Sequence, residues 1–244
     1  MAEIPSDQLY PSTDMSCPIL YEDDRIAIAD KCHGIPTVPL KTQTPDGTLL
    51  GIVASECPEV LSVVGKNPWE HGAIHRLDTA TGGLVIFAKT QAMYDYLLSI
   101  QTKDLLEKTY MADTVYSERL KGLDPYFNHD RIMKIRSYFR SYGKGSKEVR
   151  PVTDIIRADS KVQYTTIVQK DNGKDGRFRC IITRGFRHQI RAHLAWIGRP
   201  IRGDSVYGKG RPGEILALEC VSVRFPLPDG SEFSFSKEEP AKPI

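Results

Sequence analysis

The segment 75–89, with the sequence HRLDTATGGLVIFAK, places an arginine and an aspartate two residues apart just before an apolar run. The run at residues 83–88 is bounded by glycines and by polar residues, which predicts a buried strand. Arg76 and Asp78 then lie in the turn that enters a rigid strand, a common place for functional groups. A carboxylate held there can act as a nucleophile or stabilise a developing positive charge. The alternative is that Arg76 and Asp78 form only a weak ion pair within a surface turn.

Two further segments contain polar residues on predicted elements. Residues 108–116, KTYMADTVY, alternate as a strand does, and they contain Lys108 and Tyr110. Residues 185–208 read GFRHQIRAHLAWIGRPIRGDSVYG, in which 189–197 predict a helix that glycine and proline end. Other elements are expected as strands at 25–30, 162–169 and 177–183, helices at 49–57 and 90–102, and a closing hairpin around 228–230.

These segments resemble the motifs of the RluA-type RNA pseudouridine synthases, and the resemblance runs from about residue 19 to residue 235. In that family HRLDxxTSGLLxxAK surrounds the catalytic aspartate, which maps to Asp78. A Lys-x-Tyr element maps to Lys108 and Tyr110, and the arginine that pairs with the aspartate maps to Arg191 in HQIR. The chain departs from the family at four places: Gly82 replaces a serine, Cys32 replaces the proline of a Lys-Pro-x-Gly turn, Phe186-Arg187 replaces Arg-Thr, and the C-terminal segment LALEC lacks the common Leu-His-Ala.

The resemblance implies an α+β class with the pseudouridine synthase fold. The expected architecture is a mixed, largely antiparallel sheet with flanking helices and a central active-site cleft. We expect a flexible arm at 1–16 followed by one catalytic domain at 17–244.

The implied reaction breaks the bond between the sugar and a ring nitrogen of uridine, turns the uracil, and joins it again through carbon 5. No redox step is involved, so neither a cofactor nor a metal is expected. Asp78, Tyr110 and Arg191 are the expected catalytic residues. Asp78 would attack the sugar or the base, or stabilise positive charge, and the Arg191 cation would favour its ionised form. Tyr110 would stack on the base or accept the carbon-5 proton.

RNA is the implied partner, and the target uridine must leave its stack to reach Asp78. Residues 126–150 carry seven cations against two carboxylates, with five aromatic rings between them, which suits phosphates and bases. We interpret this segment by its composition and predict no strand or helix within it. The expected substrate- and RNA-binding residues are Arg76, Lys108, Arg136, Arg140, Lys147, Arg187, His188 and Gln189.

Composition narrows the class of protein without deciding the partner. The chain has 40% hydrophobic and 26% charged residues and a net charge of +2, ordinary values for a globular protein. Five cysteines without a CxxC pair favour reduced thiols. There is neither a secretory signal pattern nor an apolar run of membrane-spanning length, so we expect a cytoplasmic protein, as a monomer.

Three other functions remain open at this stage. A glycosidase would need a second carboxylate, and Asp204 is the candidate, although it is expected to shape a turn. His71 and His75 have the spacing of zinc ligands on a helix but lack the accompanying glutamate. A protein that binds or folds RNA without catalysis would use the same cleft.

Overall fold

The computed structural model describes residues 16–41, 43–117, 132–171, 175–211 and 213–237. The expected arm therefore lies outside the described residues except for Ser16, as does part of the basic segment, 126–131. None of the helices in the described ranges has the length and apolar character needed to cross a bilayer. All five cysteines lie in the described ranges, and each is a free thiol.

The elements follow one another in the order β1 Ile19–Glu22, β2 Ile26–Lys31, α1 Leu49–Glu56, η2 Pro58–Ser62, η3 Pro68–Glu70, β3 Gly82–Ala88, α2 Gln91–Thr102, β4 Glu107–Asp113, β5 Ile132–Tyr142, η5 Lys144–Ser146, β6 Glu148–Val152, η6 Ile155–Arg157, β7 Tyr164–Lys170, β8 Arg177–Ile182, α3 Gln189–Trp196, β9 Leu218–Pro226 and β10 Glu232–Ser236. The ten strands form one sheet in the order β1-β2-β3-β9-β4-β8-β7-β5-β6, and β10 pairs with β9. Only the β3–β9 pairing is parallel among the described strands. The predicted α+β class with a largely antiparallel sheet is confirmed.

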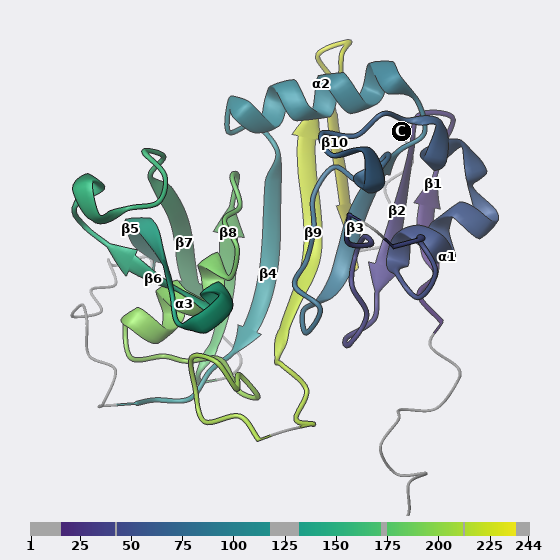
Figure 1. Ribbon diagram of the computed structural model, residues 1–244. Coiled ribbons are helices and arrows are strands. Elements are labelled where there is room, and N and C mark those ends of the chain that lie inside the picture. Colours follow the sequence, from purple (N-terminus) through teal and green to yellow (C-terminus); the bar gives the residue numbers. More distant parts are fainter. Residues whose placement is uncertain (1–15, 42, 118–131, 172–174, 212, 238–244) are drawn as a thin grey trace, which may run out of the picture.

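The sheet has two ends with β4 and β9 between them (Figure 1). One end contains β1–β3 with α1, and the other contains β5–β8 with α3 (Figure 1). Helix α2 crosses the ends of the central strands in the same view. The segment before β3 and the helix α3 therefore approach the middle of the molecule from opposite ends of the sheet.

Strand β3 is the buried strand that the sequence predicts, because all seven of its residues are buried. It pairs with β2 from Gly83 to Ala88 and with β9 at Gly82 and Gly83. Gly83 has φ of +104°, and a Cβ on it would lie 2.2 Å from the carbonyl oxygen of Cys220. Glycine is therefore required at the point where the two halves of the sheet meet.

The three predicted helices are confirmed as α1, α2 and α3. The Thr90 side chain accepts a hydrogen bond from the Met93 amide and caps α2. In α3 and its C-terminal end, Ile190, Leu194 and Ile197 are buried as predicted.

The basic segment differs from its sequence interpretation, because residues 132–142 form the eleven-residue strand β5. Met133, Ile135 and Phe139 are buried and alternate with exposed cations. This period of two is the signature of a strand with one face buried. The high charge of the segment concealed it when composition alone was considered.

Candidate active site

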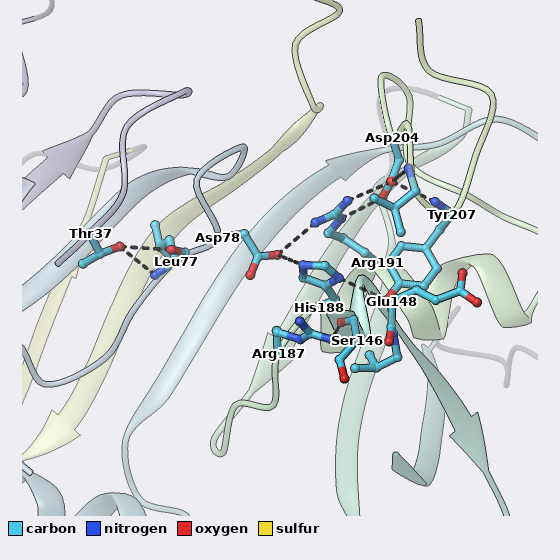
Figure 2. Close-up of polar contacts among 12 residues, drawn as sticks. Thr37, Leu77, Asp78, Ser146, Glu148, Arg187, His188, Arg191, Asp204 and Tyr207 are labelled. Atoms are coloured by element: carbon cyan, nitrogen blue, oxygen red, sulfur yellow. Dashed lines mark hydrogen bonds and ion pairs between the residues drawn. The ribbon is translucent and has the colours of Figure 1, made fainter. Parts of the chain in front are cut away.

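The backbone that carries Asp78 is fixed by a threonine distant in sequence. The Thr37 hydroxyl donates to the Leu77 carbonyl at 3.0 Å and accepts from the Leu77 amide at 3.1 Å (Figure 2). The Asp78 carbonyl accepts from the Thr81 amide at 2.9 Å, which closes the turn into β3. Hydrogen bonds on both sides of Asp78 thus fix its backbone, and no sequence motif indicated the part that Thr37 plays.

A buried lysine joins the loop after β2 to the Asp78 loop. The Lys31 ammonium donates to the carbonyls of Cys32, Ile35 and Thr79 at 2.9, 2.7 and 3.2 Å. The Gly34 amide also donates to the Thr79 carbonyl, at 2.8 Å. Burial lowers the pKa of Lys31 to about 8, against the opposing effect of nearby acidic groups that include Asp78. Lys31 therefore holds two loops together at the site.

Arg191 connects Asp78 to a second carboxylate. Its Nη1 donates to Asp78 Oδ2 at 3.2 Å, and its Nε and Nη2 donate to the two oxygens of Asp204 at 2.8 and 2.9 Å (Figure 2). The side chains of Asp204, Arg191 and Asp78 are 0%, 6% and 24% exposed. The contacts thus lead from the buried Asp204 through Arg191 to Asp78, and of these two carboxylates only Asp78 is exposed enough for a ligand to reach.

Asp204 shapes a turn, as predicted, and also orients Arg191. Its Oδ1 accepts from the amides of Val206 and Tyr207, each at 2.9 Å. Burial raises the pKa of Asp204, but the hydrogen bonds and charge of Arg191 outweigh burial and hold it below its usual value. Burial likewise lowers the pKa of Arg191, and Asp204 and Asp78 together reverse that effect. A glycosidase would need Asp204 to reach the substrate, and its burial excludes that role.

His188 lies on the other side of Asp78. Its Nε2 is 3.8 Å from Asp78 Oδ2, and its Nδ1 is 3.1 Å from the Tyr207 hydroxyl (Figure 2). That hydroxyl also accepts from the Val149 amide at 2.7 Å. Burial lowers the pKa of His188 despite the opposing effect of Asp78. A neutral imidazole adds no charge beside the carboxylate, and it becomes a cation when it accepts a proton.

Tyr110 and Lys108 lie on β4, and both are buried. Burial raises the pKa of Tyr110 well above its usual value, and the charge of Asp78 is close enough to contribute. Lys108 is 2% exposed, its Nζ donates to the Thr183 carbonyl at 3.4 Å, and burial lowers its pKa to about 8. Lys108 is therefore buried beneath the surface, and its contact with the substrate stays a prediction.

The other sequence predictions near the motifs have mixed outcomes. Arg76 forms an ion pair with Glu70 at 2.8 Å, so the alternative of an Arg76–Asp78 turn pair is wrong. Gln189 is buried and donates to the Thr165 carbonyl at 2.9 Å, and its contact with RNA stays a prediction. Arg187 is exposed and donates to the carbonyls of Ser146 and Glu148 in the β5–β6 turn (Figure 2).

The zinc hypothesis fails on geometry. His71 has φ of +46° and ends the short turn η3, and its Nδ1 is 2.8 Å from the Leu61 carbonyl oxygen. His75 lies outside any helix, and burial lowers its pKa. The two imidazoles therefore do not share a helix face. In the ranges that the structure describes, no group of three or more metal-ligating side chains occurs.

Residues 25–196 match the sequence model of a family described as RNA pseudouridylate synthase. The chain belongs to this family. Its relatives include the ribosomal large subunit pseudouridine synthase D of Nitrosomonas europaea, 29% identical over 220 residues, which are 89% of this chain and 57% of that protein. The protein of the same name from Vibrio vulnificus is 27% identical over 98% of this chain and 72% of its own length. This chain thus spans little more than half of the Nitrosomonas relative.

Solved structures show the same fold at lower sequence identity. Human RNA Pseudouridylate Synthase Domain Containing 1 superposes with a TM-score of 0.65 at 16% identity, over 95% of this chain and 87% of that chain. The resemblance inferred from the motifs and the pseudouridine synthase fold are both confirmed.

Proposed function

We propose that the protein is an RNA pseudouridine synthase that isomerises uridines in structured RNA, with Asp78 as its catalytic carboxylate. The observation that carries the proposal is the chain from Asp204 through Arg191 to Asp78, which leaves Asp78 alone of the three open to a ligand. Family membership supports the same reaction. Because relatives are named for the large ribosomal subunit, its RNA is the first substrate to test, ahead of transfer RNA.

The reaction is an isomerisation within one nucleotide. The bond from the sugar C1′ to N1 breaks, a bond from C1′ to C5 forms, C5 loses a proton and N1 gains one. Asp78 attacks the sugar or the base, or stabilises charge on the sugar, and the hydrogen bond from Arg191 orients it. Tyr110 provides a ring beside the base, and because burial raises its pKa, the phenolate that would accept the C5 proton is disfavoured. The proposal has the protein act as a cytoplasmic monomer without metal or cofactor.

Replacement of Asp78 tests the proposal. The wild-type protein should convert uridine in a large-subunit ribosomal RNA transcript, measured by chemical mapping of pseudouridine, in buffer with a metal chelator. Asp78→Asn should abolish conversion and still bind the transcript. Asp104→Asn is the matched control, since Asp104 is an exposed aspartate that also pairs with an arginine.

The outcomes separate the candidate functions. Conversion by Asp78→Asn would remove Asp78 from its role. Binding without conversion of either ribosomal or transfer RNA by the wild-type protein would favour the RNA-folding function. Conversion of transfer RNA alone would keep the reaction and change the substrate.

A further inference from the structure

A row of cations occupies one face of β5 and β6. Lys134, Arg136 and Arg140 are alternate or near-alternate residues of β5, and all three are exposed. Arg150 on β6 pairs in register with Arg140 and is also exposed. We call these four residues the basic stripe.

The opposite face of the same strand holds α3. The hydroxyl of Ser137 on β5 is 2.9 Å from His193 Nε2, and that of Thr166 on β7 is 2.8 Å from His193 Nδ1. The ring of Phe139 stacks on Phe186, with centroids 4.9 Å apart. Successive residues of a strand point to opposite faces, so the basic stripe faces away from α3.

The catalytic residues lie on the α3 face. Arg191, which holds Asp78, belongs to α3. Tyr110 pairs with Cys180, Cys180 pairs with Val168, and Val168 pairs with Met133 on successive strands. Paired residues point to the same face of the sheet, so Tyr110 lies on the face of Met133 and Phe139, which is the α3 face. The basic stripe is therefore on the side of the sheet that Asp78 does not face.

The surroundings of the stripe favour a polyanion. The residues of β7 that lie opposite Lys134 and Arg136 are Ile167 and Thr165, which are uncharged. No ion pair of Lys134 or Arg136 occurs within the described ranges. Arg150 pairs with Glu148 at 2.7 Å, so the cations that the protein leaves unneutralised are at the Lys134 and Arg136 end of the stripe. Cations of this kind repel one another, and phosphates relieve that repulsion.

One end of the stripe combines charge with an aromatic ring. The guanidinium carbon of Arg150 lies 3.8 Å from the centroid of the Tyr142 ring, and that of Arg140 lies 5.9 Å from it. Tyr142 is itself exposed. Cations beside an open ring suit the sugar–phosphate backbone and bases of single-stranded RNA.

The edge of the sheet offers a route between the two faces. β6 is the last strand in the sheet order, and β5–β8 form one end of the molecule (Figure 1). Lys147 is exposed in the β5–β6 turn, where Arg187 donates to the turn carbonyls. Arg187 precedes His188, which lies beside Asp78. Cations thus continue from the catalytic cluster around this edge to the stripe.

We propose that the basic stripe binds the backbone of an RNA segment flanking the one in the catalytic cluster, so that the substrate wraps around the β6 edge. This inference rests on the proposed function for the identity of the RNA. The RNA-binding surface of the protein then has two parts, one on each face of the sheet. A short hairpin that fills the catalytic cluster does not reach the stripe.

The test compares two double variants that each remove two positive charges. Lys134→Gln/Arg136→Gln neutralises the stripe, and Lys66→Gln/Lys103→Gln neutralises two exposed lysines outside it. Binding to a large-subunit ribosomal RNA transcript and to a short hairpin centred on the converted uridine is measured against salt. For the transcript, the stripe variant should lower the slope of log K against log salt by about 1.4 to 1.8, from about 0.7 to 0.9 per phosphate contact. The control should leave the slope unchanged, and neither variant should change binding to the hairpin.

Two results would overturn the proposal. An unchanged slope for the stripe variant on the transcript would show that the stripe binds no RNA. An equal loss on hairpin and transcript would place these cations in the catalytic cluster instead. If the wild-type protein converts no uridine, the proposed function fails, whereas the slope on the transcript still decides whether the stripe binds RNA.

Discussion

Replacement of Asp204 by asparagine tests whether a buried carboxylate supports the exposed one. Asparagine keeps the shape of the side chain and removes its charge. Arg191 then loses one of its two counter-ions, while its side chain stays 6% exposed. We expect a loss of stability together with a fall in kcat, because Nε and Nη2 of Arg191 no longer pair with the two oxygens of a buried carboxylate.

The size of the effect follows from the contacts. Breaking a buried ion pair by removing one partner costs about 3–5 kcal/mol. Asp78 remains as a counter-ion and the asparagine oxygen still accepts hydrogen bonds, so the lower end, about 3 kcal/mol, applies. At about 2–4 °C per kcal/mol for a chain of this size, Tm should fall by about 6–12 °C.

Thermal unfolding followed by circular dichroism measures the shift, and uridine conversion measures kcat. Asp104→Asn removes a carboxylate that is 55% exposed and pairs with Arg184 at 3.4 Å, and it should cost no more than about 1 kcal/mol. Equal Tm shifts in the two variants would refute the assignment of Asp204 as the buried support of Arg191.

The pH dependence of the free energy of unfolding gives a second test of the role of Asp204. The pKa of Asp204 is lowered in the folded protein, so its contribution is complete above the unfolded value of about 3.9 and is lost as pH falls through the folded value. The stability difference between the wild-type protein and Asp204→Asn should therefore be constant near neutral pH and shrink below about pH 4. A difference that grows on acidification would contradict this sign.

Three further predictions concern single positions. Thr37→Val removes both hydrogen bonds to the Leu77 backbone, so it should cost about 1–3 kcal/mol in chemical denaturation and lower kcat, and an unchanged kcat would separate Thr37 from the site. Gly83→Ala places a Cβ 2.2 Å from the Cys220 carbonyl oxygen, so the variant should be recovered mainly as insoluble protein; a soluble variant with wild-type Tm would contradict the close approach. Lys108→Met should raise stability by up to about 3 kcal/mol below pH 8, because a pKa lowered to about 8 means that folding disfavours the charged lysine, and the gain should vanish above about pH 10.4. Denaturation of Lys108→Met at pH 7 and pH 10.5 measures this difference, and a loss of stability at pH 7 would show that the ammonium is stabilising.

Local patterns explain which parts of the fold the sequence predicted. β3 and the cap of α2 depend on neighbouring residues, so an apolar run and a Thr90 signal were sufficient. The strand β5 also has a local pattern, the alternation of Met133 and Ile135 with cations, but it was concealed by the charge of the segment. β1 is short and half-exposed, and no pattern singled it out.

The candidate site depends on contacts that no local pattern specifies. Arg191 was assigned to Asp78 through family motifs, because 113 residues separate them. Thr37 binds the backbone of Leu77 over 40 residues, and its neighbours in sequence give no indication of that contact. The burial of Lys108 was unexpected for the same reason, since the elements that enclose a strand are decided by the whole fold.

The order in which the ribosome makes the chain gives the β3–β9 pairing a further meaning. β3 is joined to the rest of the sheet beyond β2 only through β9, in the described residues, and Asp78 waits for Arg191, 113 residues later. At roughly 5–20 residues per second, that interval is about 6 to 23 s of translation. During it residues 72–74 already pair with Ile86 and Ala88, but the β9 side of β3 at Gly82 and Gly83 stays unpaired, and an unpaired strand edge exposes a nascent chain to aggregation. Slow codons placed between these segments would lengthen the interval, and a chaperone that covers an unpaired strand would act during it.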